Sequence, residues 1–545
     1  MQYVMPFIVA MVVTMVCLPA LVRLAVKWLM VDHPGARKVH SIAIPRVGGV
    51  AMACGVFIAS LFTINLQSAD IWFLAAAAVL TIFGALDDRF DLDYRVKFIG
   101  QLAAVAIVVA AGDVRFQSIA LDDLLWLPGW LSVPITVVFL VGITNAVNLA
   151  DGLDGLAGGT TFLCLCAVAL LSSVGLPGST TALTLAFAGA VLGFLRFNTY
   201  PASVFMGDAG SQLLGFSIGV LSIRATQSAS SEISAAIPIL LLAVPILDTL
   251  SVMVQRIAEG RSPFSPDKNH IHHKLLAMGF GHHEAVMLIY VIQGALFVMA
   301  YFMRYESDLL ILGFVTAFFL LGLGILQFAA RTGWRFRAKG SDLSGSAVPR
   351  LMSVIHKPGL LPRLSYAAIA GGVGIYALLI IVETATLSGD FRILIVALLA
   401  VVIGFSAVLR GAPLNLIEKA ALYITATALV YLDAVVLPAN RWLSALGWAA
   451  IAVAAVATGV RLRLYNDRRF LLTPLDLIVL FMALVVPSLL DTLNLPHGGA
   501  LAIAKLVILF YALEMLVTWS ERRAVWVRIA AATVLAGLVV RPFVA

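Results

Sequence analysis

LSVPITVVFLVGITNAVNLADGLDGLAGG, residues 131–159, joins a long apolar run to a cluster of carboxylates punctuated by glycines. As a helix, the apolar part over 131–149 is long enough to cross a hydrocarbon layer about 30 Å thick. Comparable apolar runs recur along all 545 residues, which are 61% apolar and only 12% charged. A soluble domain is closer to half apolar and a quarter charged. The sequence therefore predicts an all-α fold, a polytopic bundle of membrane helices.

The apolar runs fall into two groups. We expect about 18 transmembrane helices, about 11 in the first group and about 7 in the second. The first group is predicted near 4–28, 48–65, 70–87, 98–112, 131–149, 160–177, 180–196, 211–227, 234–256, 285–303 and 308–330. The second group is predicted near 364–384, 392–409, 417–437, 441–460, 471–490, 499–519 and 524–540. The predicted domains are a membrane domain over 1–330, a basic cytoplasmic linker over 331–363 and a C-terminal membrane domain of unassigned function over 364–545.

Basic residues alternate between the predicted loops and indicate the orientation of the chain. When loops are numbered from 29–47, the odd-numbered loops hold 27 Lys and Arg residues, whereas the even-numbered loops and the C-terminal tail hold 6. Cytoplasmic loops of membrane proteins are enriched in Lys and Arg, so the odd-numbered loops are predicted to be cytoplasmic. These basic loop residues explain the net charge of +7, so the charge does not indicate a nucleic-acid partner.

Five unusual polar clusters all fall in these odd-numbered loops. They contain Lys38 and Arg46; Asp87, Asp88 and Lys97; Asn145, Asn148, Asp151 and Asp154; Phe205 and Asp208; and His270, His272 and His273. A single charged loop residue is usually solvated surface, but five clusters on one face at the edge of the hydrocarbon favour a functional site. Glycines beside Asp151, Asp154 and Asp208 indicate backbone bends and close approach to a ligand.

The chemistry that suits these clusters is phosphoryl transfer with a hard divalent cation. Mg²⁺, for which Mn²⁺ can substitute, binds one or two carboxylates and completes its shell with water and substrate phosphate. The five aspartates exceed the needs of one ion, so some of them are expected to hold sugar, base or nucleophile. Lys38, Arg46, Lys97 and the three histidines supply positive partners for phosphate oxygens.

Three alternatives remain open at this point. The histidines over 270–273 could form a zinc site, although no cysteine or carboxylate nearby completes a tetrahedron. A chain of many spans could be a transporter, but transporters place their coupling groups near the bilayer midplane rather than at one interface. The chain could also be a non-catalytic membrane scaffold, which the presence of every motif carboxylate disfavours.

Taken in order, the motifs resemble those of the polyprenyl-phosphate N-acetylhexosamine-1-phosphate transferases. The matching strings are DHPGARKVH (32–40), IPRVGG (44–49), LDDRFDL (86–92), NAVNLADGLDGLAGG (145–159), FMGDAGS (205–211) and HIHH (270–273). The resemblance covers about residues 1–330. The form of the histidine string is similar to that of the branch that uses UDP-GlcNAc and undecaprenyl phosphate.

The resemblance implies roles for individual residues. Asp208 and Asp88 are implied as Mg²⁺ ligands, and Asp87, Asp88 and Asp208 as the catalytic residues. The implied substrate-binding residues are Lys38, Arg46, Lys97, Asn145, Asn148, Asp151, Asp154, Phe205, His270, His272 and His273. Phe205 is implied as a shelf for uracil, although simple packing is an alternative.

The resemblance also implies a reaction and a place for it. A polyprenyl phosphate would attack the sugar-linked phosphorus of a UDP-sugar, directly or through an aspartyl-phosphate, and UMP would leave. The implied setting is the bacterial plasma membrane, with the site facing the cytoplasm. Its partners are the UDP-sugar, the polyprenyl phosphate and membrane lipids, and we expect the C-terminal helices to mediate a homodimer or an envelope-assembly contact.

Overall fold

The computed structural model describes residues 3–25, 27–32, 43–120, 124–173, 178–227, 232–262, 269–334, 360–383 and 441–464, with isolated positions and short runs between 396 and 540. The chain divides into two compact units. The N-terminal unit comprises Met1–Ser341 with Thr473–Ile478, and the C-terminal unit comprises Asp342–Leu472 with Val479–Ala545. The division at Ser341 falls inside the predicted linker, of which residues 335–359 lie outside the described part, so the three-domain assignment stays a prediction.

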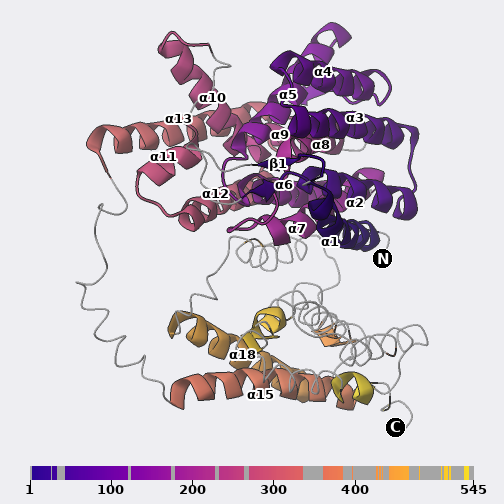
Figure 1. The fold of residues 1–545 in the computed structure, drawn as a ribbon, viewed down its shortest axis with the longest axis vertical. Coiled ribbons are helices and arrows are strands. Elements are labelled where there is room, and N and C mark those ends of the chain that lie inside the picture. Colours follow the sequence, from indigo (N-terminus) through magenta and orange to yellow (C-terminus); the bar gives the residue numbers. More distant parts are fainter. Residues whose placement is uncertain are drawn as a thin grey trace. The chain divides into compact units, whose positions relative to one another are not determined.

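The described part of the N-terminal unit is built almost entirely of helices (Figure 1). They are α1 (Val4–Ala25), α2 (Gly48–Thr63), α3 (Ser68–Phe90), α4 (Tyr94–Ala110), α5 (Gly129–Ala150), α6 (Leu156–Ser173), α7 (Ser179–Asn198), α8 (Gly207–Gln227), α9 (Ile237–Leu241), α10 (Ala243–Ala258), α11 (Ile271–Ala277), α12 (His282–Phe302) and α13 (Asp308–Thr332).

Helix α8 lies at the centre of this unit because it packs against α2, α3, α5, α6 and α7. Its side chains are buried along nearly the whole helix, and α6 is buried to a similar degree. The outer helices α1 and α13 instead expose large apolar side chains such as Val16 and Leu320, as expected of helices that face lipid. A central buried helix thus holds the polar residues at its two ends in fixed positions.

Eight helices in the described residues are long and apolar enough to cross a membrane. They are α1, α3, α5, α6, α7, α12, α13 and α15 (Leu360–Glu383). The polytopic helical fold is therefore confirmed, whereas the count of about 18 spans stays a prediction. In the C-terminal unit, α15 packs against α18 (Arg441–Leu464), and most of the spans predicted over 392–437 and 471–540 lie outside the described residues.

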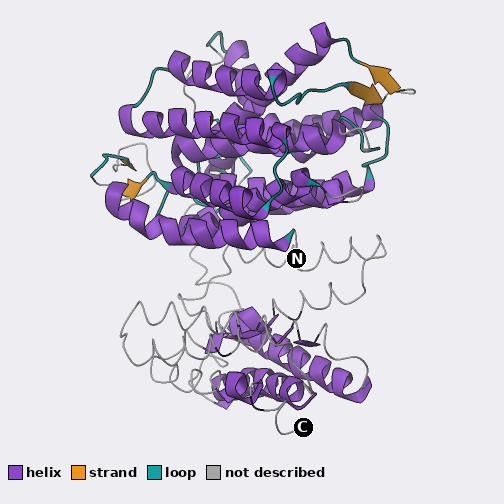
Figure 2. Ribbon diagram, turned by 90° about the vertical axis from the view of Figure 1, so that its right-hand side faces the viewer, coloured by secondary structure: helices purple, strands orange, loops and turns teal. Residues whose placement is uncertain are grey.

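The structure corrects three details of the predicted architecture. Residues 234–256 are not one helix but two, α9 and α10, separated at Leu242. Pro245 explains the break, because proline lacks an N–H and its ring clashes with the carbonyl four residues earlier. The fold also contains two antiparallel hairpins, β1 (Val31–Asp32) with β2 (Ile44–Pro45) and β3 (Ser118–Ala120) with β4 (Leu124–Trp126), which lie at opposite ends of the helices (Figure 2).

The third correction concerns the motif aspartates, which were predicted in loops. Asp87 and Asp88 lie in the last turn of α3, and Asp208 lies in the first turn of α8. Helix α3 continues to Phe90 and ends at Asp91, whose left-handed backbone (φ 51°) directs its N–H to the carbonyl oxygen of Asp87. The carboxylates are therefore carried by rigid helix ends.

Candidate active site

The ends of α3, α5 and α8 and the start of α4 bring the predicted catalytic residues together. The Nζ atom of Lys97 lies 2.5 Å from Oδ2 of Asp87 and 3.0 Å from Oδ2 of Asp208. The Nδ2 atom of Asn148 donates to Oδ1 of Asp208 at 3.0 Å and to Oγ of Ser211 at 2.7 Å. A cation and an amide thus fix the Asp208 carboxylate from two sides.

Asp88 has a different position from its neighbour Asp87. Its Oδ1 accepts the N–H of Asp208 at 2.9 Å, and its Oδ2 accepts the N–H of Ala209 at 3.1 Å. These are first-turn N–H groups of α8, which lack partners within the helix, so Asp88 caps α8 from another helix. Gly207 allows this contact, since its φ is 69° and a Cβ there would lie 2.3 Å from Oδ2 of Asp88. The role of Asp88 as a metal ligand stays a prediction.

Lys97 and Asp208 each stabilise the ionised form of the other. Burial alone would raise the pKa of Asp208, but the hydrogen bond with Asp87 and the proximity of Lys97 and Asn148 lower it overall. Burial alone would lower the pKa of Lys97, but the hydrogen bond to Asp87 and the charge of Asp208 raise it overall. Both groups are therefore ionised at neutral pH.

Asp151 ends α5 and differs from the other aspartates of the site. Among the described residues, no hydrogen bond to its carboxylate is found. Burial, and then the negative charges of Asp208, Asp88 and Asp154, raise the pKa of Asp151 to about 7. A carboxylate surrounded by carboxylates favours either a proton or a metal cation, so Asp151 suits a cation-binding role.

The first hairpin lies beside these helices. Arg46 forms an ion pair with Asp32, and the N–H of Phe205 donates to the carbonyl oxygen of Pro45 at 2.8 Å. The N–H of Gly48 in turn donates to the carbonyl oxygen of Phe205 at 2.9 Å. These bonds join the hairpin to the start of α8 and place Arg46 near the aspartates. Lys38 lies outside the described residues.

The histidine string forms the start of α11, and two of its side chains are buried. Nδ1 of His270 lies 3.0 Å from Oδ2 of Asp248 on α10. His272 packs against the loop after α5 so closely that a Cβ on Gly152 would lie 2.2 Å from its Nε2. Burial, and then the charge of His273, lower the pKa of His272 to about 4. His272 is therefore neutral at pH 7, whereas the sequence predicted a positive charge; phosphate binding by the three histidines stays a prediction.

Two predicted binding residues have partners within the protein. Nδ2 of Asn145 donates to Oε1 of Gln101 at 2.8 Å, and Nε2 of Gln101 donates to Oε1 of Gln212 at 3.3 Å, so these amides link α4, α5 and α8. Oδ2 of Asp154 accepts the N–H of Ala202 at 2.9 Å. The structure thus gives Asn145 and Asp154 positioning contacts, and their binding to substrate stays a prediction.

Sequence reasoning missed several residues of this region. Asp248 was treated as part of an apolar span, although an acid within such a span is itself a signal of function. His282 and His283 were not among the predicted site residues, and their ring centroids lie 4.4 and 4.8 Å from that of Tyr200. Nothing in the pattern around Tyr200 or Gln101 distinguishes them from ordinary loop and helix residues.

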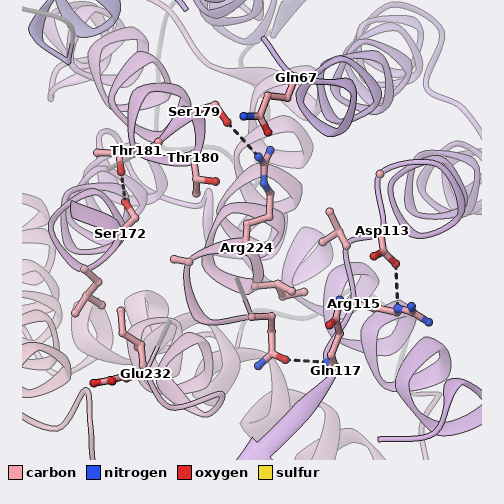
Figure 3. A pocket seen from close by; sticks show the side chains of 18 of the residues that line it. Gln67, Asp113, Arg115, Gln117, Ser172, Ser179, Thr180, Thr181, Arg224 and Glu232 are labelled. Carbon is pink, nitrogen blue, oxygen red and sulfur yellow. Dashed lines mark hydrogen bonds and ion pairs between the residues drawn. The ribbon is translucent and has the colours of Figure 1, made fainter. Parts of the chain in front are cut away.

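A separate polar cavity of about 570 Å³ lies at the opposite end of α3 (Figure 3). Its charged side chains are largely paired. Arg224 Nη2 lies 2.6 Å from Asp70 Oδ1, and Arg115 Nε lies 3.1 Å from Asp113 Oδ1. None of the predicted site residues lines this cavity. It is therefore distinct from the candidate active site.

Comparison with known proteins points to one family. The family description "Glycosyl transferase family 4" matches residues 71–226. The chain is 38% identical over 296 residues to a probable undecaprenyl-phosphate N-acetylglucosaminyl 1-phosphate transferase of Bacillus subtilis, covering 53% of this chain and 82% of that protein. It is 36% identical to a decaprenyl-phosphate N-acetylglucosaminephosphotransferase of Mycolicibacterium smegmatis, covering 49% and 74% respectively. It is 31% identical to the undecaprenyl-phosphate alpha-N-acetylglucosaminyl 1-phosphate transferase of Escherichia coli K12, covering 55% and 84%.

Proposed function

Because the chain belongs to the polyprenyl-phosphate N-acetylhexosamine-1-phosphate transferases, we propose that it transfers GlcNAc-1-phosphate from UDP-GlcNAc to a polyprenyl phosphate and releases UMP. The observation that carries the proposal is the contact of Lys97 with both Asp87 and Asp208 at the meeting point of three helices. The names of the bacterial relatives supply the sugar and the lipid class.

In the proposed reaction, an oxygen of the lipid phosphate attacks the phosphorus that carries the sugar. A new P–O bond forms, the bond from that phosphorus to the bridging oxygen breaks, and the electron pair leaves with UMP. A phosphate monoester is largely ionised at pH 7, so the nucleophile needs little help from a base. Asp87 lies beside Lys97 and is suited to remove the last proton or to orient the lipid headgroup.

The charge of the reacting phosphates is the main obstacle to such a transfer. Lys97 supplies positive charge in contact with Asp87 and Asp208, and Arg46, which pairs with Asp32, is close enough to act electrostatically on Asp151. Asp208 and Asp151 would hold Mg²⁺, or Mn²⁺ in its place, because Asp151 follows Asn148, a partner of Asp208, by three residues. The predicted ligand Asp88 already accepts two N–H groups of α8 and is less available. When bound, the ion neutralises phosphate oxygens of the donor.

The charge pattern of the loops supports a cytoplasmic site in a bacterial plasma membrane. Soluble UDP-sugars are cytoplasmic substrates of such a site, while the lipid approaches from within the bilayer. The helix ends that carry Asp87 and Asp208 are suited to this arrangement because they lie at the boundary of apolar helices.

The test uses the full chain purified in detergent with undecaprenyl phosphate and Mg²⁺. UDP-GlcNAc, UDP-GalNAc and UDP-MurNAc-pentapeptide are supplied separately, and UMP release is followed. We expect release with UDP-GlcNAc and its loss on addition of EDTA. Release with another donor would reassign the sugar, and a folded sample that releases no UMP with any donor would contradict the transferase assignment.

A further inference from the structure

Asp248 is a buried acid in helix α10, whose other charged side chain is Arg256. Its residue is 5% exposed, and its α10 neighbours Leu247 and Val252 are also buried. A buried carboxylate is costly unless it is paired and hydrogen-bonded, so the partners of Asp248 indicate its role. The mechanism proposed above does not use it.

Both oxygens of Asp248 bind the start of the histidine helix. Oδ2 lies 3.0 Å from Nδ1 of His270, and Oδ1 accepts the N–H of Ile271 at 2.6 Å. His270 is the N-cap of α11 and has no side-chain capping bond of its own. Asp248 therefore supplies from α10 the cap that α11 lacks.

The contact with Nδ1 also fixes the imidazole of His270. When Nδ1 carries the proton and donates to Asp248, Nε2 is directed to the opposite side of the ring, as in other carboxylate–histidine pairs. The ring lies parallel to that of His272, with centroids 5.8 Å apart and planes 8° apart. His272 in turn packs against Gly152, the residue after Asp151. A chain of contacts thus leads from α10 to the loop that carries the proposed cation ligand.

We infer that Asp248 is a positioning residue that holds the histidine helix against the 151–154 loop so that this side of the site binds the diphosphate of the sugar nucleotide. The inference rests on the proposed function. We place the lipid phosphate at the contact of Lys97 with Asp87, because Asp87 is the residue proposed above to orient the lipid headgroup. Loss of Asp248 therefore weakens binding of the donor, UDP-GlcNAc, and leaves binding of the acceptor, the polyprenyl phosphate, unchanged.

The experiment compares Asp248→Asn with the control Asp308→Asn in the full chain. Asp308 is also buried and also accepts backbone N–H groups, from Ala236 at 2.9 Å and Ala120 at 2.5 Å, but it binds the second hairpin. The melting temperature, kcat and the KM of each substrate are measured for both variants. We expect Asp248→Asn to raise the KM for UDP-GlcNAc about 10- to 100-fold, the loss usual for a charged hydrogen-bond partner, with an unchanged KM for undecaprenyl phosphate.

Asp308→Asn should lower the melting temperature without changing either KM. A third variant, His270→Gln, tests whether Asp248 acts through the imidazole. In that background, Asp248→Asn should raise the KM for UDP-GlcNAc no further, because the partner is already absent.

Two results would overturn the positioning role: an unchanged KM for UDP-GlcNAc in a folded Asp248→Asn protein, or equal changes in the KM of both substrates. Additive effects of Asp248→Asn and His270→Gln would overturn the route through His270. Each of these results requires an active wild-type protein, whereas an inactive wild type with every donor would refute the proposed function instead.

Discussion

Replacing Lys97 by methionine removes the cation between Asp87 and Asp208 and keeps an apolar side chain of similar length. Nζ makes two short contacts, 2.5 Å to Asp87 and 3.0 Å to Asp208. A hydrogen bond to a charged group contributes about 1.5–3 kcal/mol, so the loss of two such bonds amounts to roughly 3–6 kcal/mol. If the same interactions are needed in the transition state, kcat/KM falls about 10²- to 10⁴-fold.

The assay is UMP release from UDP-GlcNAc at saturating Mg²⁺, with the melting temperature as a check on folding. Lys97→Arg is the matched control because it keeps the charge while changing the shape of the donor group. We expect Lys97→Arg to retain more activity than Lys97→Met. A folded Lys97→Met protein with more than about a tenth of the wild-type kcat/KM, a loss below 1.4 kcal/mol, would refute the reasoning.

Three further predictions follow from the same geometry. Asp208→Asn should abolish UMP release while leaving the helical circular dichroism intact, and normal turnover of that variant would remove Asp208 from the metal site. Since the pKa of Asp151 is raised to about 7, the folded protein binds a proton that the unfolded chain releases above about pH 4, so Asp151 lowers stability progressively from pH 4 to 7. In EDTA, Asp151→Asn should therefore gain stability relative to wild type as the pH rises from 4 to 7, with no further gain above pH 7. Thermal unfolding follows this change, and an equal pH response of the two proteins would argue against a raised pKa. Gly207→Ala should cost about 1–3 kcal/mol or more of stability, because φ is 69° and the new methyl would meet Asp88 at 2.3 Å; a melting temperature equal to that of wild type would contradict the described turn.

Much of the fold follows from the sequence because the membrane restricts the possible structures. Apolar runs of sufficient length must form helices there, since the hydrocarbon leaves backbone groups no other partner. The predicted spans at 131–149 and 308–330 accordingly match α5 and α13 to within two residues. The predicted boundaries were three to four residues short where polar residues belong to helix ends, as at Asp87 and Asp208.

The candidate site was predictable in part for a different reason. Its residues occur in dense clusters, so composition alone separates Asp151 or His270 from ordinary loop residues. The contacts among them depend on helices far apart in the sequence, such as that of Lys97 with Asp208, and no local pattern encodes them. Asp248 was missed because its partners lie 22 and 23 residues further along the chain, beyond the end of α10.

The paired aspartates at the end of α3 illustrate how one short motif can serve two purposes. Successive residues on a helix point about 100° apart, so neighbouring carboxylates cannot share one direction. Asp87 faces Lys97, while Asp88 faces the backbone at the start of α8. Two adjacent residues of the same type therefore have different contacts: Asp87 lies against the cation of the candidate site, and Asp88 holds the start of α8 in place. Loss of activity after substitution of Asp88 would then report a displaced helix as readily as a missing reactive group.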